Sequence, residues 1–544
     1  MASSVWEGDE RSDLDAVLSN HGRPWDLVVI GGGITGAGIL LEAARRGLKA
    51  LLIEQRDFAW GTSSRSSKLV HGGLRYLKEG KFHLTRDSVR ERQALMQDAH
   101  GLVDHQSFAF ADYQGRKPGR WMFALGLAIY DKMARQTARH YFPTDEFLMM
   151  TPHIGRQNLK GGLSYHDAKT DDARLVMRVL QEAKSLGATA INYLAASKID
   201  YVNDLAQGVQ ANDTITGQDY QIRARSIINA TGAWADRLRL SKELNGKIRP
   251  LRGSHLLMPG WRLPVAQAVS LMHPRDGRPV FVYPWEGVTL VGTTDVDHHA
   301  DLQTETAITP DEVTYLMEAL AFQFPSLALG LDDIIATFAG VRPVIDTGKA
   351  DPSKEGRDHA VWMEKGLLTV TGGKLTTFRL IALDALKHLM PLLPDWRPDL
   401  RITPLFDNAQ IHRRQHQEVD LPRSQRDRLF GHYGRLTPEV IAAAHKHELE
   451  LIPGTETMWV ELRWAARYES VLQLEDLLLR RTRLGLLLKN GGVEYLPRIR
   501  TICQGELKWD DTRWNVEQAA YLELWQKNYA LPAKSTIKDW LVNE

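Results

Sequence analysis

Two short apolar runs, separated by a stretch with helical spacing, form the first clear pattern along the chain, within residues 26–55. Residues 27–30 are leucine, valine and isoleucine, which predicts a buried strand, and residues 50–53 form a second run of the same kind. Residues 34–46 between them are rich in helix formers. Strand, helix and strand within about 30 residues predict a βαβ unit.

Apolar residues at helical spacing predict further helices at residues 84–99, 171–186, 310–324, 374–390 and 459–488. Gly187 is a stop signal directly after the helix predicted at 171–186. Short strands among prolines and turns over residues 249–345 predict a mostly antiparallel sheet, which would form a separate substrate lobe. The region from about residue 396 onward is rich in leucine, arginine and tryptophan, and we interpret it as a helical domain for packing or self-association.

Three glycines follow the first apolar run at the spacing of a dinucleotide-binding turn. Gly31 permits the tight turn, Gly33 lets the backbone approach a pyrophosphate, and Gly36 lets helix and strand pack closely. The helix start adds free N–H groups and a positive dipole end, and Glu54 is placed to accept hydrogen bonds from a ribose. The alternative is that these are only turn glycines of a doubly wound sheet, but the strand and helix on either side favour dinucleotide binding.

A second strand, glycine and helix pattern lies at residues 368–378. Gly372 and Gly373 lead into a helix start that carries Lys374, which makes another site for an anion. Such a helix start, aimed at a flavin, would stabilise the negative charge of the reduced ring. The strand that ends in Thr231 and Gly232 suits a further cofactor contact, although this short motif is common.

Residues 62–76 contain five hydroxyls, two glycines and three cations directly after the second apolar run. One reading is a solvated connection, the default for a serine-rich loop. The other is that the loop lies along the cofactor and delivers Arg75 and Tyr76 to an anionic substrate. Position along the chain does not separate the two.

The segment 116–135 has cations at both ends and bulky apolar residues, with Trp121 and Tyr130, between them. It is too short to span a bilayer but suited to lying in the membrane interface. A helix buried in the protein core fits the same pattern, so both readings stay open.

Composition narrows the function class. The 544 residues have a net charge of +1 and 25% charged residues, which gives no reason to expect binding to nucleic acid. Cys503 is the only cysteine, which excludes a disulfide framework and a cysteine metal site and suits a reducing cytoplasm. No run of 18 apolar residues occurs, and the acidic residues 1–24 predict a mobile tail, with room for one short helix, rather than a secretory signal. The acids and histidines at 295–301 lack the pattern of a calcium loop, so we expect no metal.

Taken together, these motifs resemble those of the FAD-dependent, aerobic-type glycerol-3-phosphate dehydrogenases. The resemblance covers about residues 25–390 with the motifs in order. It depends mainly on Thr-Ser-Ser, Ser-Ser-Lys-Leu, His-Gly-Gly-Leu-Arg-Tyr and Gly-Gly-Lys-Leu-Thr-Thr, and the arginine-rich stretch at 480–485 is also similar to theirs. It implies an α/β fold: a Rossmann-like FAD-binding domain of the glutathione-reductase type, an antiparallel-sheet substrate domain and an α-helical C-terminal domain.

This division predicts a discontinuous architecture. We expect the tail at 1–24, the FAD-binding domain at 25–100, 165–248 and 340–392, the substrate domain at 101–164 and 249–339, and the helical domain at 393–544.

The resemblance also implies roles for particular residues. FAD would be held by the glycines, hydroxyls and acid already described, with further residues beside the ring: Gly31, Gly33, Gly36, Glu54, Thr62, Ser63, Ser67, Lys68, Leu69, Thr231, Gly232, Lys374, Leu375 and Thr376. The substrate, glycerol 3-phosphate, would be gripped by cations and two ring side chains: Arg75, Tyr76, His255, Arg342, Arg357 and Lys374. Several convergent cations suit a phosphate ester with close to two negative charges.

The implied reaction removes a hydride from C2 of glycerol 3-phosphate and gives dihydroxyacetone phosphate. His255 is our candidate for the base and His71 the second choice, because histidine titrates near neutral pH. Lys374 or Arg342 would polarise the developing alkoxide. Electrons would pass to membrane quinone, which fits a cytoplasmic protein held on the inner face of the cytoplasmic membrane through 116–135, and we expect a homodimer.

Three rival functions remain open. A flavin oxidase would use oxygen on the same substrate. An amine or amino-acid oxidase of the same fold would need a site for a carboxylate and an amine. A binding or regulatory protein would keep the dinucleotide fold without turnover.

Overall fold

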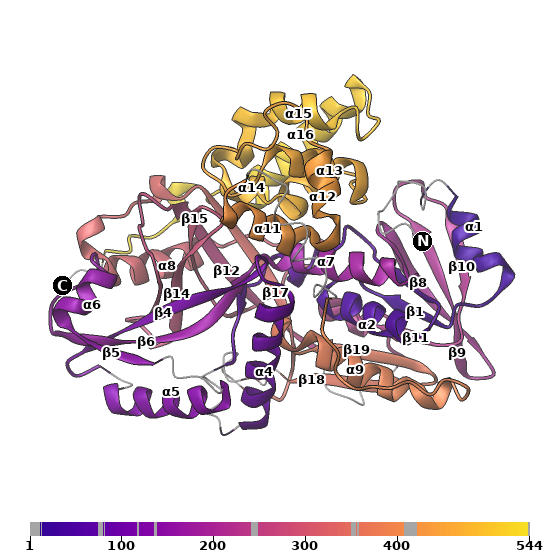
Figure 1. Ribbon diagram of the computed structural model, residues 1–544, viewed down its shortest axis with the longest axis horizontal. Coiled ribbons are helices and arrows are strands. Elements are labelled where there is room, and N and C mark those ends of the chain that lie inside the picture. The colour runs from indigo at the N-terminus through magenta and orange to yellow at the C-terminus, as the bar shows by residue number, and fades with distance from the viewer. Residues whose placement is uncertain are drawn as a thin grey trace.

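Two β-sheets lie side by side in this computed structural model, and a group of helices packs across the junction between them (Figure 1). The structure describes residues 11, 13–73, 80, 82–116, 119–134, 139–240, 248–349, 355, 358–406 and 421–541.

The first sheet contains the strands of the predicted βαβ unit (Figure 1, right). Its central strands pair in parallel, and only one edge strand is antiparallel. The order across the sheet is β18 (His359–Glu364), β19 (Leu367–Gly372), β11 (Ile227–Asn229), β1 (Leu27–Ile30), β2 (Ala50–Ile53) and β7 (Thr189–Ile191). This is the expected Rossmann-like sheet.

Both faces of this sheet are covered, which explains why its central strands β1 and β2 are apolar throughout. Val29 packs with three helices on one face, α2 (Ile34–Arg45), α7 (Asp172–Ser185) and α9 (Phe378–Leu389). Val28 packs on the other face with a three-stranded antiparallel sheet of β8 (Leu194–Val202), β9 (Leu205–Asp213) and β10 (Asp219–Arg223).

The N-terminal residues 1–24 contain the one short helix that the sequence allowed, and this helix is packed against the protein. Helix α1 (Leu14–Ser19) packs beside β10, and its Leu14 and Leu18 are buried. The side chain of Asp13 accepts a hydrogen bond from the amide of Ala16 and caps the helix. The spacing of Leu14 and Leu18, four residues apart, places both on one face of this helix.

The second sheet has ten strands and is mixed, because β13 and β4 pair in parallel and the other neighbours pair antiparallel (Figure 1, left). Its main order is β16 (Val296–Asp297), β12 (Ile248–Pro259), β15 (Val288–Gly292), β14 (Pro279–Trp285), β13 (Ala268–Met272), β4 (Val103–Tyr113), β6 (Leu159–Thr170) and β3 (Leu69–Val70), with β17 (Ala336–Ile345) beside β12 and β5 (His140–Pro143) beside β6. Four helices accompany it: α4 (Phe82–Asp98), α5 (Arg120–Ala134), α6 (Thr144–Met150) and α8 (Pro310–Gln323).

The pairing of β3, β6 and β17 differs from the predicted division of the chain. Residues 69–70, 165–170 and 340–345 were expected in the FAD-binding domain, yet they belong to the second sheet. The reason is backbone hydrogen bonding: β17 pairs with β12 from Ile345 to Ala336. Pairing partners far apart in sequence leave no signal in the apolar pattern.

The C-terminal domain is helical, as expected, but its longest predicted helix is broken. Residues 459–488 form a helix, a π-helical turn (Asp476–Arg481) and a short helix rather than one element. The α-helices are α11 (Arg423–Tyr433), α12 (Thr437–Ala442), α13 (Trp459–Tyr468), α14 (Leu484–Leu487), α15 (Leu496–Cys503) and α16 (Asp511–Asn528).

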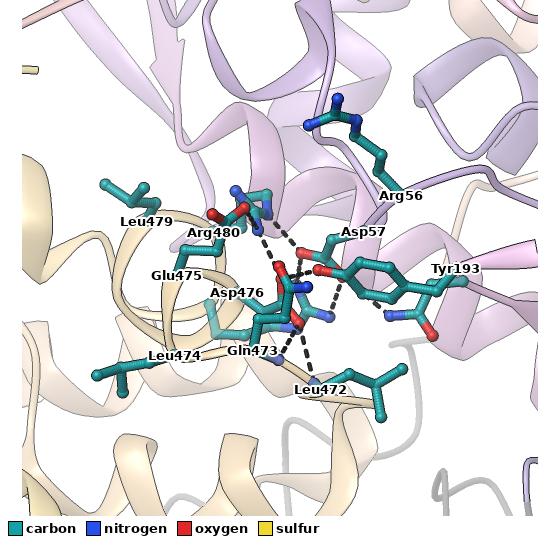
Figure 2. Close-up of polar contacts among 12 residues, drawn as sticks. Arg56, Asp57, Tyr193, Leu472, Gln473, Leu474, Glu475, Asp476, Leu479 and Arg480 are labelled. Carbon is teal, nitrogen blue, oxygen red and sulfur yellow. Dashed lines mark hydrogen bonds and ion pairs between the residues drawn. The ribbon is translucent and has the colours of Figure 1, made fainter. Parts of the chain in front are cut away.

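A buried carboxylate, Asp57, joins this helical domain to the first sheet (Figure 2). Arg481 donates to both of its oxygens at 2.7 Å, and Arg480 Nε donates at 2.5 Å. Arg480 also pairs with Asp476 at 2.6 Å. Burial raises the pKa of Asp57, but the charges of Arg481 and Arg480 outweigh it and hold the pKa below the ordinary value.

A second buried cluster lies nearby and joins the same domains. Asp172, at the start of α7, accepts hydrogen bonds from Lys68 Nζ at 2.9 Å and from Arg483. Burial and the charge of Arg483 lower the pKa of Lys68 to about 8, against the opposing effect of Asp172. The segment after β2 therefore contacts the helical domain at two places, through Asp57 and through the carbonyl of Ser64, which accepts from Arg483.

We expect Asp57→Ala to lower the free energy of unfolding by about 3–5 kcal/mol, because it removes the carboxylate that pairs with the buried Arg481 and one of the carboxylates that pair with the buried Arg480. Chemical denaturation of the purified protein measures this. The matched control is Asp395→Ala, which removes a carboxylate that is 92% exposed and 3.9 Å from Arg225; it should change stability by at most about 0.5 kcal/mol. Equal effects of the two variants would contradict the assigned role of Asp57.

Candidate cofactor and substrate site

A cavity of about 330 Å³ lies across the carboxyl ends of β2, β1, β11 and β19, where ligands bind in parallel sheets of this kind. Its walls come from the turns after these four strands and from the segment after β2. The lining includes Gly31, Gly33, Ile34, Thr35, Glu54, Gln55, Trp60, Gly61, Thr62, Ser63, Ser66, Ala196, Ser197, Thr231, Gly232, Trp234, Arg237, Pro343, Thr371, Gly372, Gly373, Lys374 and Leu375.

The glycine turn after β1 requires its glycines. Gly31 has φ +116°, and a Cβ there would lie 2.6 Å from the carbonyl oxygen of Ala230. A Cβ on Gly36 would lie 1.9 Å from the carbonyl oxygen of Gly31. Helix α2 starts directly at the cavity, and its N-cap residue Gly33 has no side chain. The amide of Ile34 donates to Ser63 Oγ, and the next amides of this first turn are oriented for an anion.

Glu54 closes the other side of this turn. Its carboxylate accepts hydrogen bonds from the amides of Gly32 at 2.6 Å and Arg56 at 2.9 Å. Burial raises the pKa of Glu54, and these two amides partly oppose the shift. Because Glu54 also lines the cavity, its remaining acceptor capacity is available to ribose hydroxyls.

The segment 62–69 lies between the cavity and the second sheet. Thr62 and Ser63 line the cavity, and Thr62 Oγ1 donates to the carbonyl of Val341 on β17 at 2.5 Å. Ser63 Oγ accepts from the amide of Ile34 at 3.0 Å. The first residues of this loop therefore lie at the cavity, whereas Arg75 and Tyr76 at its far end lie outside the described residues.

Not every residue expected around FAD lines the cavity. Gly36 acts through helix packing, and Lys68 is fully buried against Asp172 and the carbonyl of Ser64. Ser67, Leu69 and Thr376 also lie outside the lining.

The second strand, glycine and helix pattern is present in the structure. Gly372 and Gly373 have φ near +80°, at +76° and +79°, and they lead into Lys374 and a 3₁₀ turn before α9. Lys374 lines the cavity, and its Nζ donates to Ser88 Oγ on α4 at 3.0 Å. Thr376 Oγ1 donates to the carbonyl of His71. Lys374 and its two glycines follow β19, whereas Glu54 follows β2. Because β11 and β1 lie between these two strands, Lys374 and Glu54 reach the cavity from opposite sides.

Two candidates for substrate contact lie on the second sheet. Arg342 on β17 donates to Asp295 Oδ1 at 3.0 Å and to Thr293 Oγ1 at 2.9 Å. Asp295 is therefore the ion-pair partner of this arginine. The next residue, Pro343, lines the same cavity as Gly33 and Lys374.

His255 on β12 lies beneath the loop at 62–69. It is 1% exposed, stacks on Phe338, and has Nε2 3.0 Å from Ser67 Oγ. Burial, and then the charges of Arg342 and Lys68, lower the pKa of His255 well below its ordinary value. The other expected substrate contacts, Arg75, Tyr76 and Arg357, lie outside the described residues.

The acids near His298 and His299 have ion-pair partners. Asp295 pairs with Arg342 and Arg278, and Asp297 pairs with Arg249 at 2.6 Å. In the part of the chain that the structure describes, no three metal-ligating side chains gather into a site.

The sequence analysis did not identify two groups of residues that form or support this site. Trp60, Trp234 and Arg237 line the cavity, with the two indole centroids 5.7 Å apart. Arg480 and Arg481 hold the turn that contains Asp57. The available signal was the run of arginines after Leu477, Leu478 and Leu479, because buried cations require buried counter-ions.

The residues present suit FAD. Gly31 and Gly33 admit a pyrophosphate, Glu54 suits a ribose, and the glycine turn before Lys374 approaches from the far side of an extended cavity. This combination defines a flavoprotein of the Rossmann-like class.

Comparison with known proteins agrees. The sequence model of the FAD-dependent oxidoreductase family matches residues 26–379, and that of the C-terminal domain of α-glycerophosphate oxidase matches residues 405–514. The chain belongs to the FAD-dependent oxidoreductase family, and its cofactor is FAD.

Individual relatives are more specific. The chain is 38% identical over 367 residues to the aerobic glycerol-3-phosphate dehydrogenase of Staphylococcus aureus, a match that spans 66% of this chain and 66% of that relative. A solved structure of the glycerol-3-phosphate dehydrogenase from Bacillus halodurans, complexed with FAD, is similar with a TM-score of 0.76 and 25% identity, over 99% of this chain and 100% of that one. The L-α-glycerophosphate oxidase of Mycoplasma pneumoniae shares the fold, with a TM-score of 0.56 and 18% identity over 70% of this chain and 97% of that one.

We expect Gly36→Ala to abolish FAD binding, because the new methyl group would collide with the carbonyl of Gly31 and displace the turn. Flavin absorbance per purified protein measures this, with circular dichroism to confirm folding. Gly126→Ala on α5, where a Cβ has nothing within 4 Å, should keep full flavin content. Retention of FAD by the Gly36 variant would contradict the assignment of this turn.

Proposed function

We propose that the protein oxidises sn-glycerol 3-phosphate to dihydroxyacetone phosphate with FAD as the hydride acceptor. The observation that carries the proposal is that Lys374 and Pro343, the neighbour of Arg342 on β17, both line the cavity that begins at Gly33. The similarity to glycerol-3-phosphate dehydrogenases, one with FAD bound, supports it.

The division of labour follows from charge and burial. Arg342 and Lys374 bind the phosphate ester or the developing alkoxide, since a phosphate monoester needs several cationic donors. Arg342 keeps its Asp295 partner, which orients the guanidinium. His255, kept neutral by its environment, is available to take the C2 hydroxyl proton. Arg75, Tyr76 and Arg357 complete the proposed contacts.

We further propose that electrons pass to membrane quinone and that α5 rests on the membrane surface. Trp121, Met122 and Leu125 on α5 are 77%, 70% and 64% exposed, while Leu127 and Tyr130 on the opposite face are buried. An exposed apolar face near Arg120 and Lys132 suits an interfacial helix. In the described part of the chain, no helix has the length and apolar character needed to span a bilayer. In this view α5 lies at the lower edge of the molecule and the helical domain lies at the top (Figure 1).

Anaerobic addition of glycerol 3-phosphate should bleach the visible absorbance of the bound flavin, because the substrate delivers a hydride to it. Reoxidation then separates the acceptors: a quinone analogue should restore the colour much faster than oxygen alone. Fast reoxidation by oxygen would instead establish a glycerol-3-phosphate oxidase. The match to the C-terminal domain of α-glycerophosphate oxidase is the reason to test this alternative. No bleaching with glycerol 3-phosphate, but bleaching with glycine or sarcosine, would replace the proposed substrate.

Arg342→Lys should raise KM for glycerol 3-phosphate roughly tenfold, because the ammonium keeps the charge but loses the fork of donors. Steady-state kinetics with a quinone analogue measures this. Arg397→Lys, on the exposed segment after α9, should leave KM unchanged. An unchanged KM in both variants would place the substrate away from Arg342.

Replacing Trp121 and Leu125 together with serine should lower binding to anionic lipid vesicles at least tenfold, because it removes the apolar contact of α5. Vesicle co-sedimentation provides the measurement. Val516→Ser, at a position that is 57% exposed on α16, is the control and should bind like wild type. Undiminished binding of the double variant would contradict the contact through α5.

A further inference from the structure

His255 is enclosed so that a substrate cannot touch its Nε2 directly. The ring is 1% exposed, and one face stacks on Phe338 with centroids 4.5 Å apart and planes 12° apart. A Cβ on Gly292 would lie 2.1 Å from His255 Cδ2, so β15 closes the ring edge. The one hydrogen-bond partner of its Nε2 among the described residues is Ser67 Oγ, at 3.0 Å.

Ser67 is on the accessible side of this pair. It is partly exposed where His255 is not, and its neighbour Ser66 lines the cofactor cavity. The hydroxyl of Tyr283 donates to the carbonyl of Ser67 and holds the backbone in place. A serine hydroxyl has one donor and two acceptor sites, so Ser67 Oγ can donate to His255 while it accepts from another hydroxyl.

The charges that face the imidazole keep it neutral and therefore able to accept a proton. Burial makes the largest contribution to lowering the pKa of His255, and the charges of Arg342 on β17 and Lys68 in the loop lower it further. Lys68 is paired with Asp172, while Arg342 is the cation assigned to the substrate. A bound phosphate ester would offset the charge of Arg342, which makes protonation of His255 easier once substrate is present.

We propose that Ser67 is a catalytic proton relay between the C2 hydroxyl of the substrate and His255 Nε2. The proposal rests on the proposed function. The C2 hydroxyl gives its proton to Ser67 Oγ, and Ser67 gives its own proton to His255 Nε2. The C2–H bond breaks with its electron pair, the hydride leaves to the cofactor, and the C2=O bond forms. No other reactant is needed.

The test compares Ser67→Ala and Ser67→Thr with wild-type holoenzyme. Ser67→Ala should slow anaerobic flavin bleaching by glycerol 3-phosphate about 100-fold, the scale of lost acid–base catalysis. Flavin content and the affinity for inorganic phosphate, measured from the flavin spectrum, should stay unchanged. Ser67→Thr keeps a hydroxyl and should recover most of the rate. In protein with nitrogen-labelled histidine, the Nε2 resonance of His255 should shift in Ser67→Ala without substrate.

Two further comparisons separate a relay from a packing role. The double variant Ser67→Ala with His255→Gln should be no more than about threefold slower than either single variant, because both remove the same path. Ser185→Ala, at the end of α7, is the control and should bleach at the wild-type rate. A Ser67→Ala rate within about threefold of wild type, or additive losses in the double variant, would overturn the relay alone. Wild-type flavin that glycerol 3-phosphate leaves oxidised would overturn the proposed function and the relay with it.

Discussion

The burial of Asp57 between Arg480 and Arg481 is the interaction on which the cofactor site depends most. Asp57 opens the turn in which Ala59 N donates to the carbonyl of Gly32 and Trp60 reaches the cavity wall. The arginines come from more than 400 residues later in the chain and line none of the described cavity. The folded state depresses the pKa of Asp57, so its stabilising contribution is present at neutral pH and is lost as the pH falls through the ordinary range of an aspartate and then through this lower value.

The same arrangement explains how two sheets build one site. The first sheet supplies the nucleotide cradle, where steric limits at Gly31 and Gly36 decide the backbone path. The second sheet carries Arg342, the cation that we propose binds the substrate, and His255, the proposed base. The segment 62–69 lies between them, held by Thr62 to β17 and by Lys68 to α7. Residues that never meet a ligand therefore set the distance between the cofactor and the substrate contacts.

The sequence predicted the parts of this site that local geometry determines. Glycine spacing predicted the turn after β1, and Gly372, Gly373 and Lys374 predicted the second glycine turn at the cavity, because each turn depends on neighbours within a few residues. Sheet membership was less predictable: β17 joined β12 because of long-range pairing that apolar patterns do not encode. The need for counter-ions to Arg480 and Arg481 was readable from their apolar surroundings, but the identity of Asp57 was not. The contact between Ser67 and His255 likewise arises only when the loop folds over β12.

A crystal structure of the protein with FAD and glycerol 3-phosphate bound anaerobically in a His255→Gln variant tests the central claim most directly. The account predicts the pyrophosphate at the Gly31–Gly33 turn, the flavin ring beside Lys374, and the phosphate ester within hydrogen-bond distance of Arg342 with its C2 hydroxyl at Ser67. A flavin bound in this cavity with the ester held elsewhere, out of reach of both Arg342 and Lys374, would contradict it.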